Sequence, residues 1–122
     1  MERVFTLEEA TALLPQLTEL LTALRDAQRV AMDLGGASAR HTVSSNGSAA
    51  AAVTASAPML EVERLGGEIE GLGVILRDPE TGLVDFASVR EGEQIYLCWR
   101  LGEERIGHFH PRDTGFMGRQ PL

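Results

Sequence analysis

The spacing of apolar residues changes once along this 122-residue chain, and that change constrains the fold class. Up to about residue 72 the apolar residues recur every three or four positions, which is the period of an amphipathic helix. After Gly71 and Gly73 they alternate, as they do in strands with one buried face. We therefore predict an α+β domain in which a helical part is followed by a small antiparallel sheet.

The helical part is predicted to be an antiparallel helical hairpin. Thr6 and Glu9 have the spacing of a capping box at the start of the first helix. Pro15 has no backbone donor and predicts a kink near Leu14. The expected segments are a kinked helix over residues 1–34, a flexible Gly/Ser/Ala-rich linker over residues 35–57, and a second helix over residues 58–72 with Pro58 in its first turn.

Residues 73–122 are predicted to form a four-stranded antiparallel β-meander that ends in a C-terminal tail. The alternation is clearest where Ile95, Leu97 and Trp99 would share the buried face, so we expect Trp99 to lie beneath the helices. A chain of this length is typical of one hydrophobic core. Residues 1–122 are therefore expected to be a single domain.

The charge and composition of the chain limit the classes of partner. The formal net charge is −7, and the eleven basic residues are all Arg and are scattered along the sequence. Such a chain is not expected to bind nucleic acid or an anionic membrane surface. No apolar run is long enough to span a membrane, and the single Cys excludes an internal disulfide. We expect a cytoplasmic protein.

Three segments resemble one bacterial protein family: FTLEEATALLP, DPETGLVDF and LCWRLGEERIGHFHPRDTGFMGRQPL. Over residues 4–34 and 60–122 the chain is similar to the family called domain of unknown function 2203. The resemblance implies a long helical hairpin followed by a small β-rich end in a bacterial cytoplasmic protein. It implies no activity. Residues 35–57 depart from the charged helix that family members carry there, whereas the C-terminal His-x-His-x-x-Asp pattern is shared.

The clearest candidate site consists of His108, His110 and Asp113. Alternate residues of a strand point the same way with side-chain origins about 7 Å apart, so both imidazoles can converge on one divalent metal ion such as zinc. Asp113 can add an oxygen ligand. Glu103 or Glu104 would be the base if the protein were a metal-dependent hydrolase.

The turn that follows Leu101 decides which residues the two histidines contact. An even-numbered turn pairs His108 with Trp99 and His110 with Leu97, so that both histidines share the apolar face. In this register they would be packing residues that hydrogen-bond to the backbone. Turns of two or four residues are both even, and we therefore predict this register.

An odd-numbered turn, or a bulge, gives a different neighbourhood. His108 and His110 would then lie beside Cys98 and Arg100. In that register Cys98 and the two histidines would form a trio suited to a soft metal ion.

The leading functional prediction is a non-enzymatic interaction module. The apolar stripe from Leu7 to Leu34 is wider than one short helix covers, which predicts a homodimer through the helical hairpin, or docking of another protein. The β-rich end would carry a small polar pocket around His108 and His110. The alternative is the metal-binding protein described above.

Overall fold

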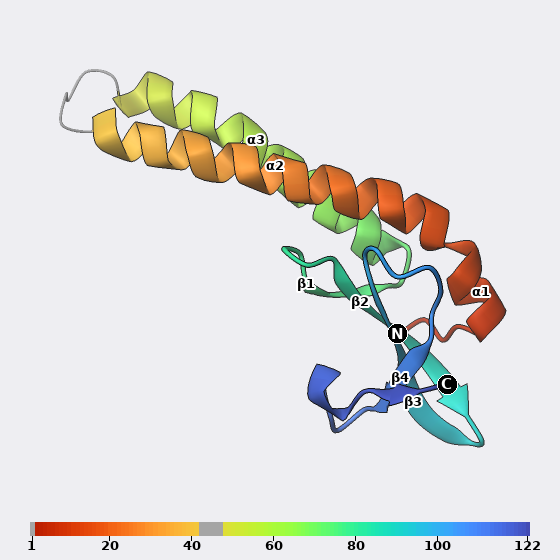
Figure 1. Cartoon of the computed structure of the whole chain (residues 1–122). Coiled ribbons are helices and arrows are strands. Elements are labelled where there is room, and N and C mark those ends of the chain that lie inside the picture. Colours follow the sequence, from red (N-terminus) through yellow and green to blue (C-terminus); the bar gives the residue numbers. More distant parts are fainter. Residues whose placement is uncertain (1, 42–47) are drawn as a thin grey trace.

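The computed structural model describes the backbone of residues 2–41 and 48–122, and the side chains of residues 2–33 and 57–122. Two long helices lie side by side and project from one end of an antiparallel sheet, which confirms the α+β prediction (Figure 1). The elements in chain order are α1 (Leu7–Ala12), α2 (Leu14–His41), α3 (Ser48–Gly71), β1 (Ile75–Asp78), β2 (Leu83–Arg90), β3 (Glu93–Arg100), β4 (His108–Pro111), a 3-10 helix η1 (Phe116–Gly118) and β5 (Gln120–Pro121).

The first helix begins and breaks where the sequence predicts. The backbone N–H of Glu9 donates to the Thr6 hydroxyl at 3.0 Å, and the backbone N–H of Thr6 donates to the Glu9 carboxylate at 2.9 Å. These two bonds complete the capping box. α1 ends at Ala12 and α2 begins at Leu14, directly before Pro15, and the chain bends there (Figure 1).

The helical hairpin is longer than predicted. α2 continues to His41 and α3 begins at Ser48, so residues 35–41 and 48–57 of the predicted flexible linker are helical. Alanine has the highest helix propensity, and the alanine run at 49–52 accounts for the early start of α3. Pro58 accordingly lies inside α3 and not in its first turn. Residues 42–47 lie outside the described residues, and the mobility of the linker stays a prediction.

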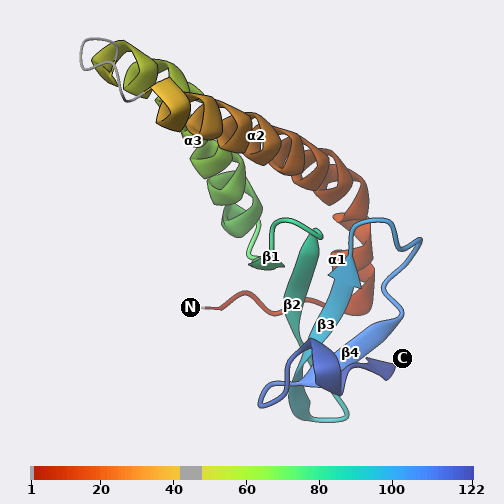
Figure 2. The ribbon, with the colours of Figure 1, turned by 60° about the vertical axis from the view of Figure 1, so that its left-hand side comes forward.

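The strands pair in chain order, β1-β2-β3-β4-β5, as a meander. The four predicted strands are present, and the C-terminal tail adds a two-residue strand, β5, beside β4. Figure 2 shows the sheet below the helical hairpin, with α1 beside it. Trp99 is 2% exposed, which confirms its predicted burial. The buried core contains Phe5, Ala10, Leu14, Leu17, Leu21, Leu24, Leu65, Ile69, Val74, Val84, Phe86, Ile95, Leu97, Trp99 and Ile106.

The register between β3 and β4 differs from the one we predict from turn length. Cys98 pairs with His108, and Tyr96 pairs with His110. Both histidines therefore lie on the face opposite Trp99, and the register predicted from an even-numbered turn is wrong. The odd-numbered alternative is right in placing the two histidines on the face of Cys98.

The register between β3 and β4 differs from the prediction because the connection from Leu101 to Gly107 is a folded loop and not a tight turn. Ile106 is buried in the core, and the Trp99 indole N–H donates to the backbone carbonyl of Glu103 at 3.1 Å. These contacts hold the loop against the helix-facing side of the sheet. The chain then re-enters the sheet with His108 opposite Cys98.

No helix in the described part of the chain combines the length and the apolar character needed to cross a membrane. This agrees with the absence of a long apolar run in the sequence.

Replacing Trp99 by Ala should lower the free energy of unfolding by about 3–5 kcal/mol, because it leaves a cavity in the core. Urea denaturation measures this change. Met117 is 96% exposed, and Met117→Ala should stay within about 0.5 kcal/mol of wild type. Equal losses in the two variants would contradict the core position of Trp99.

Candidate functional site

The face of the sheet opposite the helices carries a buried polar cluster. Asp85 of β2 pairs across the strands with Cys98 of β3, and Cys98 pairs in turn with His108 of β4. His110 lies two residues further along β4, opposite Tyr96. Asp85, Cys98 and His110 are each no more than 2% exposed. Three chemically reactive side chains are therefore withdrawn from solvent on this face.

The alternation of β2 explains why a carboxylate is buried here. Val84 and Phe86 are fully buried in the core, so Asp85 between them must point to the other side of the sheet. The C-terminal segment then covers that side, and Thr114 lines a cavity together with Asp85. A Cβ atom at Gly118 would collide with the Thr114 side chain, so glycine is required for this segment to fold back closely.

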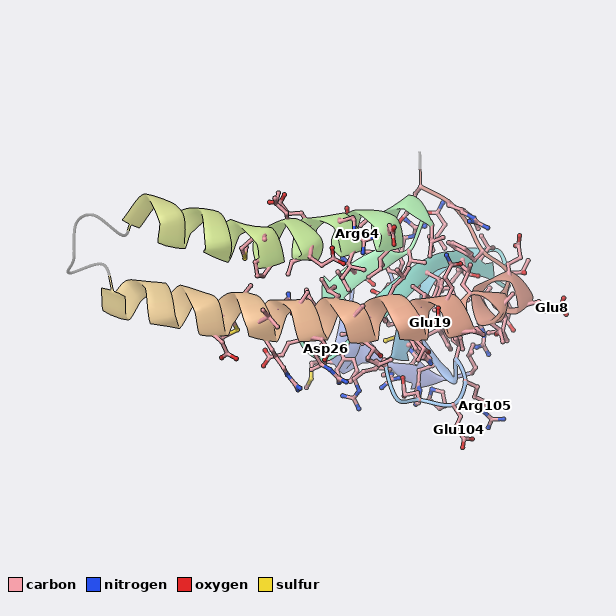
Figure 3. All side chains as sticks on the ribbon, turned by 90° about the horizontal axis from the view of Figure 1, so that it is seen from above. Glu8, Glu19, Asp26, Arg64, Glu104 and Arg105 are labelled. Atoms are coloured by element: carbon pink, nitrogen blue, oxygen red, sulfur yellow. The ribbon has the colours of Figure 1, made fainter. Side chains whose placement is uncertain are left out.

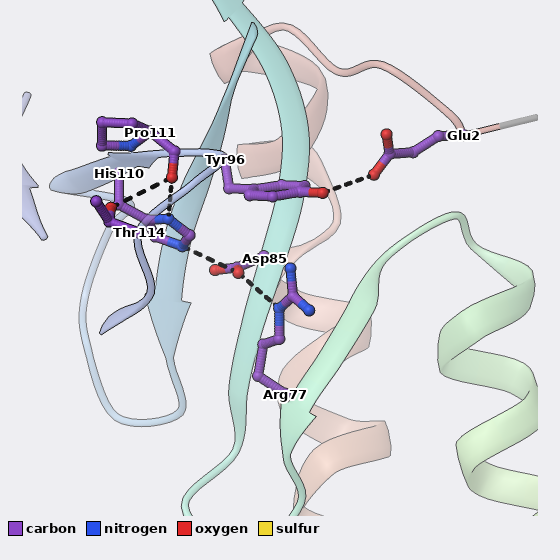
Figure 4. Close-up of polar contacts among 7 residues, drawn as sticks. All are labelled: Glu2, Arg77, Asp85, Tyr96, His110, Pro111 and Thr114. Atoms are coloured by element: carbon purple, nitrogen blue, oxygen red, sulfur yellow. Dashed lines mark hydrogen bonds and ion pairs between the residues drawn. The ribbon is translucent and has the colours of Figure 1, made fainter. Parts of the chain in front are cut away.

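Asp85 is the centre of the cluster (Figure 4). Its Oδ2 atom accepts a hydrogen bond from Arg77 Nε at 2.8 Å and lies 3.0 Å from His110 Nε2. Its Oδ1 atom is buried and has no hydrogen-bond partner among the described residues. An unsatisfied buried acceptor costs roughly 1–3 kcal/mol. Oδ1 is therefore available for a further ligand.

His110 is held at both ring nitrogens by acceptor oxygens. Nδ1 lies 2.9 Å from the Pro111 carbonyl oxygen and can only donate to it, and Nε2 faces Asp85 Oδ2. The Tyr96 ring packs beside the imidazole with its centroid 5.5 Å away. Nδ1 must carry a proton to donate to the Pro111 carbonyl, which leaves Nε2 as the ring nitrogen that faces Asp85 and could bind an ion.

The Cys98 thiol is protonated at neutral pH. Burial, together with the negative charge of Asp85, raises the pKa of Cys98 to about 11. Only the thiolate is an effective nucleophile, so this environment disfavours covalent catalysis by Cys98. A bound metal ion would displace the thiol proton and bind the thiolate.

Asp85, Cys98 and His110 form a group that could hold a metal ion. One ligand atom from each residue lies within 4.8 Å of the other two. Ligand atoms of a tetrahedral zinc site are about 3.5 Å apart, so only a small adjustment of side chains is needed. The Pro111 carbonyl already orients the imidazole as the carbonyl partners of histidine ligands usually do.

Of the three ligands predicted from the sequence, the structure brings His110 into this group. His108 lies on the same face and is half-buried, and its Nδ1 atom is buried with no partner among the described residues. Asp113 is exposed. The group contains Asp85 and Cys98 in their place.

Glu103 and Glu104, which the sequence suggested as bases of a metal-dependent hydrolase, lie in the loop between β3 and β4. Both oxygens of Glu103 accept from Arg119 Nη2 at 2.7 Å, and Oε1 also accepts from the backbone N–H of Arg100. Burial opposes ionisation of Glu103, but these bonds and the charge of Arg119 outweigh it and lower the pKa of Glu103. The side chains of Arg100 and Glu104 are exposed, and Glu104 points outward (Figure 3).

Asp85 and Arg77 were not among the predicted site residues. The signal for Asp85 was present in the sequence, because an acidic residue stands between the apolar Val84 and Phe86 of one predicted strand. That pattern indicates a carboxylate on the face opposite the core. Pairing this strand with the Cys98 strand would have placed the two residues together.

The comparisons with known proteins identify a family and no activity. A family model described as Uncharacterized conserved protein (DUF2203) matches residues 3–122. The matched range includes the helical hairpin, the sheet and all three residues of the metal-binding group. No curated protein and no solved structure gives a significant match.

Replacing Cys98 by Ala should make the protein more resistant to alkaline unfolding. Below about pH 9 the thiol is protonated in both folded and unfolded chains. Between pH 9 and its folded pKa of about 11 it ionises only in the unfolded chain, so wild type loses stability as the pH rises. Urea titrations should give the variant a relative gain of about 2 kcal/mol between pH 8 and pH 10.5. If the difference in the free energy of unfolding between the two proteins does not change from pH 8 to pH 10.5, the raised pKa of Cys98 is contradicted.

Proposed function

We infer that this chain, which belongs to the DUF2203 family, is a metal-binding protein with Asp85, Cys98 and His110 as ligands. The observation that carries the inference is the buried Asp85 Oδ1 atom, which lacks a hydrogen-bond partner among the described residues. It belongs to a group of carboxylate, thiol and imidazole atoms whose separations suit one ion. A metal ion would satisfy Oδ1 and would explain why these three side chains are buried together.

The contacts of Asp85 allow an ion to enter with little rearrangement. Arg77 binds Oδ2, so Oδ1 can turn to the ion while the Arg77 bond is kept. His110 Nε2 would exchange its contact with Oδ2 for the metal and keep its Nδ1–H bond to the Pro111 carbonyl. One sulfur, one nitrogen and one oxygen ligand suit zinc.

A fourth ligand position would face the cavity beside the group. This cavity has a volume of about 300 Å³, and Arg112, Thr114 and Phe116 lie among its lining residues. Three protein ligands with one open position are the arrangement of catalytic zinc sites. His110 alone is poorly placed for acid–base catalysis, because both of its nitrogens are already bonded within the protein.

Zinc should bind tag-free protein at one ion per chain, and Cys98→Ala or His110→Ala should each weaken binding strongly. Loss of a residue that only supports a ligand lowers metal affinity roughly 10- to 100-fold, and loss of a ligand should lower it further. Calorimetry in two buffers of different ionisation enthalpy should show that wild type releases the Cys98 proton on binding zinc and that Cys98→Ala does not.

The control for this titration is Asp113→Ala, because Asp113 is exposed and outside the group. Its zinc affinity should equal that of wild type. If His108→Ala and Asp113→Ala abolish zinc binding while Cys98→Ala retains it, the ligand set predicted from the sequence is right, and the set of Asp85, Cys98 and His110 is wrong. Absence of zinc binding by wild type would contradict the metal-binding function itself.

A second proposal concerns the helical hairpin, which we propose to mediate homodimer formation. Val30 and Met32 of α2 and Met59 and Leu60 of α3 are each at least half exposed. Figure 3 shows these two helices extending beyond the sheet, and Met32 and Met59 line a cavity between the hairpin and the turn that joins β1 and β2. A second copy packed along the same helices would bury these side chains in a four-helix bundle.

Light scattering at micromolar concentration should give about twice the 13.2 kDa mass of one chain. Met32→Glu combined with Leu60→Glu should shift the protein toward monomer, because charges would be buried at the interface. Val89 is equally exposed at the far end of the sheet, and Val89→Glu should leave the mass unchanged. A monomeric wild type would contradict the homodimer.

A further inference from the structure

We propose that the cavity beside Asp85 is a binding site for a small oxyanion, a phosphate or carboxylate group, held by Arg77 and Arg112. The proposal goes beyond metal binding and does not require the ion to be present. It rests on the charge of the cavity lining and on a carboxylate of the chain itself that already contacts one of the two arginines.

The lining of the cavity is positive although the chain as a whole is acidic. Arg77 and Arg112 line it together with one acidic residue, Asp85, whereas the formal net charge of the protein is −7. Arginine recognises carboxylate and phosphate groups because its planar guanidinium offers paired donors. A cavity of about 300 Å³ lies at the lower end of ligand-site volumes, which restricts the ligand to a small molecule or group.

The guanidinium groups of both arginines pack against the ring of Tyr96. The guanidinium of Arg112 lies 4.8 Å from the centroid of Tyr96, and that of Arg77 lies 5.1 Å from it. The Nε atom of Arg112 is buried and has no partner among the described residues. Arg77 binds Asp85 through Nε, and its two terminal nitrogens point away from Asp85 (Figure 4). Donors therefore remain on these two side chains.

The carboxylate of Glu2 is not part of the cavity lining, but it shows that Arg112 and Tyr96 can bind a carboxylate. Arg112 Nη1 donates to Glu2 Oε2 at 2.6 Å, and the Tyr96 hydroxyl donates to Glu2 Oε1 at 3.2 Å (Figure 4). The Arg112 hydrogen bond, assisted by the charges of Arg112 and Arg77, lowers the pKa of Glu2. Glu2 is about one-third exposed and precedes α1, so an incoming oxyanion can displace it from Arg112.

The test uses full-length, metal-free protein titrated with inorganic phosphate and, separately, with succinate. Backbone NMR shifts at Tyr96 and Arg112 report binding in this cavity. Glu2→Gln removes the competing carboxylate and should raise the affinity for at least one of the two anions about tenfold. Glu104→Gln removes the same charge from an exposed loop and should leave the affinity unchanged (Figure 3).

A second pair of variants separates this site from a general effect of charge. In the Glu2→Gln background, Arg112→Gln should abolish the gain, while Arg105→Gln, at an exposed position of the loop, should preserve it. Circular dichroism checks folding, and Arg112→Lys replaces Arg112→Gln if the latter unfolds. Equal effects of Glu2→Gln and Glu104→Gln, or no binding of either anion, would overturn the proposal. Because no metal is present, these outcomes leave the zinc proposal untouched.

Discussion

The buried carboxylate of Asp85 is the constraint on which the polar half of this structure depends. Removing a carboxylate from water is costly unless hydrogen-bond donors or opposite charges surround it. Arg77 from β1 and His110 from β4 both contact Asp85 Oδ2. One atom of β2 therefore links the neighbouring strand β1 to β4, which lies beyond β3 on the other side. The positions of β1 and β4 relative to the site are therefore coupled through this carboxylate.

The sheet separates two kinds of chemistry because side chains alternate along each strand. On one face Trp99 packs beneath the helices, and on the other its neighbour Cys98 lies beside Asp85. A shift of one residue in the register would exchange the two faces. Ile106 and the Trp99–Glu103 bond fix the loop before β4, and in this way the apolar core determines that His110 reaches the polar face.

The capping box, the helix break and the order of the strands were predictable from the sequence, and the register of β4 and the place of Asp85 in the site were not. The capping box at Thr6 and the break before Pro15 involve neighbouring residues whose geometry is set by the backbone. The register of His110 depends on Ile106 entering a core built from distant helices, which turn-length preferences do not contain. Asp85 joins the site only through the pairing of β2 with β3, so a search for ligands near the histidines in sequence could not find it.

The charges of the three candidate ligands explain why a divalent ion could be buried in this group. Without an ion, the raised pKa of Cys98 keeps a proton on its thiol. A divalent ion bound by the carboxylate of Asp85, the thiolate of Cys98 and the neutral imidazole of His110 would displace that proton, and its two positive charges would be balanced by the two anionic ligands. The loaded group would therefore bury no net charge in a desolvated site. The open fourth position of that ion would face the cavity lined by Arg77 and Arg112, so binding of a metal ion and binding of an oxyanion would be coupled through this shared space.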